Sequence, residues 1–209
     1  MSLLQDALFY GIVDMGYVAP EQIEEATKQL LAGGAGIIQL RAKGQAKEQI
    51  QEWAQALQPI CREAERPFIV NDHIDIAAEV DADGVHLGQD DGPLATARDL
   101  LPTGKLVGRS THSPAQALAA LEEGADYIGF GPLFPTPTKA GRPSIGLEDV
   151  AAVQASVGTQ IPVFCIGGIK RSNLEEVLAA GARRVVIVSD VLSAPNREEA
   201  VREVTSRLT

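Results

Sequence analysis

The chain lacks the features that would direct it to nucleic acids or membranes. It carries 18 lysine and arginine residues against 28 acidic ones, a formal net charge of -10. Such a surface repels polyanions and anionic lipids. The N-terminal stretch MSLLQDALFYGIVD has no basic leader, and no apolar run reaches the roughly 18 residues of a membrane span. We therefore expect a cytoplasmic protein in which any anionic ligand is held by a local group of cations.

Cysteine and aromatic residues are also scarce. Cys61 and Cys165 have no metal or redox spacing, and the three histidines, His73, His86 and His112, lack the spacing of zinc ligands. Both cysteines are expected to be packing residues in a reducing compartment. Aromatic residues make up 4% of the chain and apolar residues 45%. A core of small and branched aliphatic side chains is typical of parallel strands covered by helices.

Short apolar runs alternate with amphipathic segments from one end of the chain to the other. Period-2 and β-branched patterns predict eight strands: 9–13, 36–40, 67–70, 84–87, 106–108, 127–130, 163–166 and 184–188. Apolar residues at helical spacing predict eight helices between and after them: 20–32, 47–64, 74–80, 94–101, 114–123, 147–155, 173–180 and 197–208.

This eightfold repetition of strand and helix predicts a (β/α)8 TIM barrel that forms a single domain over residues 1–209. No linker or low-complexity tract marks a boundary. A doubly wound open sheet is the alternative, but no GxGxxG motif follows the first strand. Ligands of such barrels bind at the C-terminal ends of the strands, so the residues that follow the strands are the candidates for function.

The second strand ends in Gln39, Arg41 and Lys43, which alternate and so share one side. Two cations on the interior of a closing barrel are costly without an anion, which favours an anion site over a solvated strand end.

Two carboxylates follow the next two strands. Asp72 and Asp91 would lie at adjacent strand ends and could bind Mg²⁺, which commonly takes one or two carboxylates. Either could instead be a helix N-cap, and Asp90 is an alternative to Asp91.

The fifth strand ends near Ser110, which could donate to a phosphate, and His112, which is either a structural hydrogen-bonding residue or an acid/base. The stretch from Tyr127 to Gly146 opens into a long loop with Thr136, Thr138 and Lys139. We interpret this loop as a phosphate-gripping lid, the alternative being a polar surface loop. Gly168 after the seventh strand and Ser189 after the eighth indicate a phosphate cradle.

Taken together, these motifs resemble the thiamine phosphate synthase family, which also includes thiazole tautomerases. The resemblance runs from Tyr10 to Asp190 and is carried by YGIVD, QLRAK, ND, DGVHLGQDD, GRSTHS, GADYIGFGPLFPTPTKAGRPSIGLE, IPVFCIGGI and VVIVSD. It implies condensation of hydroxymethylpyrimidine diphosphate with a thiazole phosphate, with release of pyrophosphate. It also implies Mg²⁺ at Asp72 and Asp91, which selects Asp91 over Asp90 by analogy.

The resemblance assigns roles by position. Arg41, Lys43, Ser110 and Lys139 are the catalytic candidates that stabilise the departing pyrophosphate. The pyrimidine diphosphate would be held by Gln39, Leu40, Arg41, Ala42, Lys43, Asn71, Ser110 and Lys139. The thiazole phosphate would be held by Thr136, Pro137, Thr138, Gly168, Val188 and Ser189.

Two positions depart from the usual synthase pattern. His73 replaces an arginine, and Arg109 stands where a small apolar residue is common. A tautomerase that uses His112 is therefore the first alternative, and a non-catalytic phospholigand-binding barrel is the second. The partners expected are the small-molecule substrates, without nucleic acid or membrane, and the sequence is compatible with a homo-oligomer.

Overall fold

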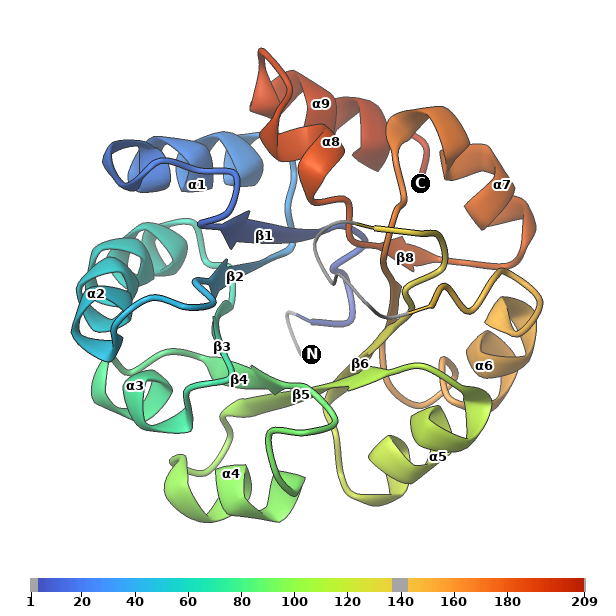
Figure 1. Ribbon diagram of the computed structural model, residues 1–209, viewed down its shortest axis with the longest axis horizontal. Helices are drawn as coiled ribbons and strands as arrows, with labels where there is room; N and C mark the ends of the chain where they lie inside the picture. Colours follow the sequence, from blue (N-terminus) through green and yellow to red (C-terminus); the bar gives the residue numbers. More distant parts are fainter. Residues whose placement is uncertain (1–3, 137–142, 209) are drawn as a thin grey trace.

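The computed structural model describes residues 4–136 and 143–208, and in it eight parallel strands lie side by side in the order of the sequence. Figure 1 shows them as a ring with the helices outside. A single bridge between Phe9 and Val185 brings the last strand back to the first. The strands are β1 (Tyr10–Asp14), β2 (Ile37–Arg41), β3 (Phe68–Asn71), β4 (Gly84–Leu87), β5 (Leu106–Thr111), β6 (Tyr127–Phe130), β7 (Val163–Cys165) and β8 (Arg184–Val185). The predicted TIM barrel is confirmed.

The helices cover the outside of this ring close to their predicted positions. They are η1 (Pro20–Gln22), α1 (Ile23–Ala32), α2 (Lys47–Glu63), α3 (Ile74–Glu79), α4 (Leu94–Leu100), α5 (Pro114–Glu122), α6 (Val150–Ser156), η3 (Arg171–Asn173), α7 (Leu174–Ala179), α8 (Ser189–Leu192) and α9 (Arg197–Thr205). Helix α8 was not predicted. It begins at Ser189, directly after the segment 184–188 predicted as the eighth strand, of which only Arg184–Val185 forms β8. Among the described residues no helix is long and apolar enough to cross a membrane.

Side chains alternate between two cores, as period-2 strands require. The inner core fills the barrel and contains Tyr10, Ile37, Ile69, Tyr127 and Phe164. The three aromatic rings pack edge to face, with centroids 5.2–5.9 Å apart. The outer core lies between strands and helices and contains the other, outward-facing strand residues.

One glycine explains how a large ring fits inside a barrel of small diameter. A Cβ built on Gly108 of β5 would collide with the ring of Tyr127 on neighbouring β6. The interior at this level therefore holds one tyrosine and a glycine in place of two side chains of ordinary size.

The cysteines are free and buried, as expected. Burial raises the pKa of both Cys61 and Cys165 to about 12, so neither thiol is ionised at neutral pH.

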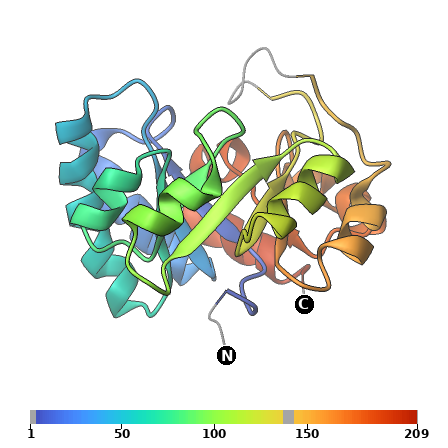
Figure 2. The ribbon, with the colours of Figure 1, turned by 90° about the horizontal axis from the view of Figure 1, so that it is seen from below.

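The two ends of the barrel differ. Leu4 and Ala7 of the N-terminal segment pack into the inner core, and they cover the end at which the strands begin. Figure 2 shows the first and last described segments at this end, while β5 runs toward the opposite face. The barrel interior is therefore accessible from the C-terminal ends of the strands.

Candidate active site

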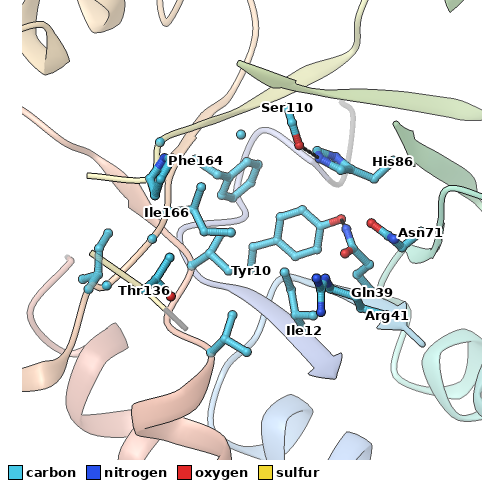
Figure 3. Close-up of a pocket in the computed structure, with 18 of the residues that line it drawn as sticks. Tyr10, Ile12, Gln39, Arg41, Asn71, His86, Ser110, Thr136, Phe164 and Ile166 are labelled. Carbon is cyan, nitrogen blue, oxygen red and sulfur yellow. Dashed lines mark hydrogen bonds between the residues drawn. The ribbon is translucent and has the colours of Figure 1, made fainter. Parts of the chain in front are cut away.

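A cavity that is partly open to solvent lies at the C-terminal ends of the strands. Figure 3 shows side chains from strands all around the barrel pointing into it. It is lined by Tyr10, Ile12, Gln39, Arg41, Asn71, His86, Ser110, His112, Gly129, Gly131, Pro132, Thr136, Phe164, Ile166, Gly167, Gly168, Ile169, Val186, Val188 and Ser189.

Strand β2 supplies a cation whose partner the sequence analysis missed. Arg41 Nη1 donates to Asp14 Oδ2 at 2.6 Å, and the two residues are paired across β1 and β2. Asp14 Oδ1 also accepts from the amide of Gly16 at 2.9 Å. The guanidinium is thus held against the cavity wall by a buried carboxylate, and an incoming anion does not have to order it. Asp14, at the end of the YGIVD motif, was the sequence feature from which this partner could have been predicted.

A chain of hydrogen bonds crosses the floor of the cavity. Gln39 Nε2 donates to the hydroxyl of Tyr10 at 2.7 Å, and that hydroxyl lies 2.9 Å from the hydroxyl of Tyr127. The Tyr127 hydroxyl lies 3.2 Å from His86 Nδ1, and His86 Nε2 lies 3.0 Å from Ser110 Oγ, as Figure 3 shows for the last contact. Burial is the largest cause that raises the pKa of both tyrosines, so their hydroxyls stay protonated.

The donors in this chain depend on the tautomer of His86. With a proton on Nε2, His86 donates to Ser110 Oγ and accepts from Tyr127; with a proton on Nδ1, both directions are reversed. Tyr10, Tyr127 and His86 were not predicted as site residues because their contacts join strands far apart in the sequence.

A charged group lies beside the cavity, at the ends of β2, β3 and the loop after β4. Lys43 Nζ lies 2.9 Å from Asp72 Oδ2, and the carboxyl groups of Asp72 and Asp91 lie close enough to shift each other's pKa. Asp91 Oδ2 also accepts from the amide of Gly88 at 2.7 Å. Neither aspartate caps a helix, because the N-cap positions of α3 and α4 are His73 and Pro93. The side chains of Lys43, Asp72 and Asp91, which the sequence predicted at adjacent strand ends, therefore lie close together.

The two carboxyl groups are not equivalent. Burial, with the Asp91 carboxylate adding to it, raises the pKa of Asp72 although Lys43 opposes the shift. Burial also acts to raise the pKa of Asp91, but the Gly88 amide, Asp72, Lys43 and Arg109 together lower it. The two carboxyl groups therefore titrate as a pair, in which Asp91 loses its proton before Asp72.

A divalent cation fits this arrangement. It would offset the repulsion between the two carboxylates, and carboxylate oxygens suit Mg²⁺. In the described part of the chain no group of three or more histidine, cysteine and acidic side chains could hold a metal ion. A site with two carboxylates relies on substrate oxygens and water for its other ligands, which is the usual situation for Mg²⁺. Asp72 also has a left-handed backbone, φ 65°, a strained conformation that is often found at functional sites.

The segment after β6 packs against the segment after β7. The amides of Leu133 and Phe134 donate to the carbonyls of Ile166 and Gly167, both at 2.9 Å. A Cβ on Gly168 would lie 2.6 Å from Phe134 Cβ, so this position requires glycine. Thr136 lines the cavity at the end of this segment. The predicted site residues Pro137, Thr138 and Lys139 lie outside the described residues.

The remaining predicted residues lie in two different environments. Leu40 and Ala42 are buried in the outer core and do not line the cavity. Val188 and Ser189 line the cavity at the start of α8. His112 also lines it, with its ring Nδ1 against the carbonyl of Gly131.

Residues 9–191 match the family described as "Thiamine monophosphate synthase". The chain is 45% identical over 184 residues to "Thiamine-phosphate synthase" of Thermus thermophilus, covering 88% of each protein. It is 42% identical to the protein of that name from Lawsonia intracellularis, covering 95% of this chain and 91% of the relative. With the Synechocystis protein of that name the identity is 44%, over 90% of this chain but 54% of the relative, so the chain spans about half of that protein.

A solved structure agrees with these relatives. The chain superposes on "Thiamine phosphate pyrophosphorylase from Pyrococcus furiosus" with a TM-score of 0.86 and 35% identity, covering 99% of this chain and 96% of that one. None of these four proteins is named a tautomerase, so the comparisons do not favour that alternative.

Proposed function

The chain belongs to the thiamine monophosphate synthase family, whose members are transferases, and we propose that it condenses hydroxymethylpyrimidine diphosphate with a thiazole phosphate. The products are thiamine phosphate and pyrophosphate. One observation carries the proposal for this chain. The contacting group Lys43, Asp72 and Asp91 lies beside a cavity into which Arg41 and Ser110 point. Cations and a divalent-ion site next to each other are what a departing diphosphate needs.

The diphosphate end of the pyrimidine substrate is assigned to this charged side of the cavity. Arg41, already oriented by Asp14, offers N–H donors, and Lys43 offers an ammonium group. Ser110, whose Oγ lies 3.0 Å from His86 Nε2, offers a hydroxyl group on the cavity wall. Mg²⁺ held by Asp72 and Asp91 would neutralise charge on the leaving group. Lys139, outside the described residues, is the fourth catalytic candidate.

The amide groups of Gln39 and Asn71 are assigned to the pyrimidine ring. The bond between the methylene carbon and the diphosphate oxygen breaks, and its electron pair leaves with pyrophosphate. The pyrimidine amine stabilises the resulting methylene cation. The thiazole nitrogen then gives its lone pair to that carbon and forms the new C–N bond, so no protein nucleophile or proton transfer to the protein is needed.

The apolar wall of the cavity supports such a dissociative reaction. Ile12, Phe164 and Ile166 line it. Water that reached the methylene cation would convert it to the alcohol, so a dry wall favours capture by the thiazole. The phosphate of the thiazole is assigned to the other side, to Thr136, Gly168 and the backbone amides at Val188 and Ser189, together with Pro137 and Thr138.

A coupling assay with both substrates tests the proposal. Purified protein should form thiamine phosphate and pyrophosphate in equal amounts with Mg²⁺, and chelation of the metal should stop both. The Asp99→Asn variant, changed on the exposed face of α4, is the control and should behave like the wild type. Absence of thiamine phosphate with both substrates and Mg²⁺ present would contradict the proposed reaction.

Three further assignments remain our predictions. They are a single-domain organisation over residues 1–209, a cytoplasmic location, and compatibility with a homo-oligomer.

A further inference from the structure

Arg109 is the one buried arginine of β5, and it points away from the cavity. It alternates with Gly108 and Ser110, which face the interior, and 7% of its surface is exposed. An arginine in such a position must have its donors satisfied by nearby acceptors. Its partners are two backbone carbonyls of the neighbouring loop after β4.

Those carbonyls lie on either side of Asp91, the proposed metal ligand, in the sequence. Arg109 Nη1 donates to the carbonyl of Gly88 at 2.9 Å and to the carbonyl of Gly92 at 2.7 Å. One nitrogen therefore connects both ends of the five-residue segment that carries Asp91. We call this segment, Gly88–Gly92, the Asp91 loop.

Other contacts also hold the Asp91 loop in place. Within the Asp91 loop, the Gly88 amide donates to Asp91 Oδ2, and a Cβ on Gly88 would lie only 2.8 Å from that oxygen. Gln89 Nε2 donates to the carbonyl of Ser110 at 2.6 Å, so a second hydrogen bond fastens the loop to β5. Gly92 has a left-handed backbone, φ 91°. The loop has no regular structure of its own, and these side-chain contacts hold it in place.

From this geometry we propose that Arg109 is a positioning residue that holds the Asp91 carboxylate against Asp72 and thereby sets the affinity of the site for a divalent cation. The inference rests on the proposed function, because it takes Asp72 and Asp91 as the metal ligands. Groups that orient metal ligands typically change metal affinity about tenfold to a hundredfold when they are removed.

The structure provides a matched control at the other end of the barrel. Arg98 of α4 also donates to two backbone carbonyls, those of Lys105 at 2.8 Å and Gly124 at 2.7 Å. It follows the Asp91 loop by six residues in the sequence, but its contacts, with Lys105, Gly124 and Asp126, lie where β5 and β6 begin. Arg98→Met therefore removes two carbonyl contacts, as Arg109→Met does, and also an ion pair with Asp126 at 2.7 Å, without touching the metal ligands.

The test is to measure Mn²⁺ binding by electron paramagnetic resonance in the presence of inorganic pyrophosphate. Arg109→Met should raise the Mn²⁺ dissociation constant about tenfold, and Arg109→Lys, which retains a cationic donor, should raise it less. Arg98→Met should bind Mn²⁺ like the wild type even if it melts at a lower temperature. In the coupling reaction, Arg109→Met should need more Mg²⁺ but approach the wild-type kcat when Mg²⁺ is saturating.

The possible failures are distinguishable. Unchanged Mn²⁺ affinity in both Arg109 variants, with a wild type that couples its substrates, would overturn the positioning role alone. Equal loss of affinity in Arg98→Met would also overturn it, because the effect would then follow general stability. A wild-type protein that binds Mn²⁺ but forms no thiamine phosphate would contradict the proposed function instead.

Discussion

At the scale of single residues, the site depends on charges that are paired before any ligand arrives. Arg41 and Asp14 form a buried pair, with 13% and 4% of their side chains exposed. Buried pairs contribute modestly to stability as pairs, but removal of one partner leaves an uncompensated charge. The pair therefore orients the guanidinium, and it makes Asp14 indispensable although no substrate role is assigned to it.

We predict that Asp14→Asn lowers the free energy of unfolding by about 2 kcal/mol, because Arg41 loses its anionic partner. Urea denaturation measures the change. Pyrophosphate should stabilise the variant more than the wild type, since it supplies the missing negative charge. Stability equal to that of the exposed control Asp99→Asn would contradict this account of the pair.

At the scale of elements, one arginine connects three short helices behind the proposed thiazole phosphate site. The backbone amide and Nε of Arg171, in η3, donate to Asp190 of α8 at 3.1 and 2.8 Å. Arg171 Nη1 donates to Glu203 of α9 at 3.2 Å. These contacts fix the start of α8, where Val188 and Ser189 line the cavity.

The Asp190 contact predicts a pH dependence. Burial acts to raise the pKa of Asp190, but the hydrogen bonds and charge of Arg171 outweigh it and lower the pKa. A folded pKa below the unfolded value of about 3.9 gives stability that is present above that pH and lost as the pH falls through the folded value. Asp190→Asn should therefore cost about 1 kcal/mol at pH 7 and much less at pH 3.

Urea denaturation of the wild type and the variant at both pH values measures this difference. Glu199→Gln, which removes an exposed pair with Arg202, is the control and should change little at either pH. A loss for Asp190→Asn that is the same at pH 3 and pH 7 would refute the electrostatic explanation.

At the scale of the whole molecule, the barrel can enclose its aromatic interior only because small residues face large ones. Gly108→Ala should destabilise the protein by about 1–3 kcal/mol, because the new Cβ collides with the ring of Tyr127. Gly129→Ala is the matched control on the next strand. Its Cβ would meet its nearest neighbour, His86, at 3.6 Å, an ordinary contact. Thermal unfolding that ranks the two variants equally would contradict the packing argument.

The sequence was sufficient to predict the eight-stranded barrel and the polar residues at its open end. Strand alternation predicted that Gln39 and Arg41 face inward, and strand order predicted that Asp72 and Asp91 meet, since both depend on local patterns and on adjacent strands. The chain from Tyr10 to Tyr127 and His86 was not predictable in this way, because its contacts span 117 and 41 residues. Likewise, the sequence could not predict that the outward-facing Arg109 holds a loop, because this depends on the exact path of that loop.

The most direct measurement of the central claim is the Asp91→Ala variant, studied by the coupling assay and by calorimetric binding of thiazole phosphate. If the diphosphate and its cation are held at the Lys43, Asp72 and Asp91 group, coupling should fall about a hundredfold or more while thiazole phosphate binds almost as in the wild type. Coupling close to the wild-type rate, in a variant that is folded, would contradict the claim that this group holds the diphosphate and the metal.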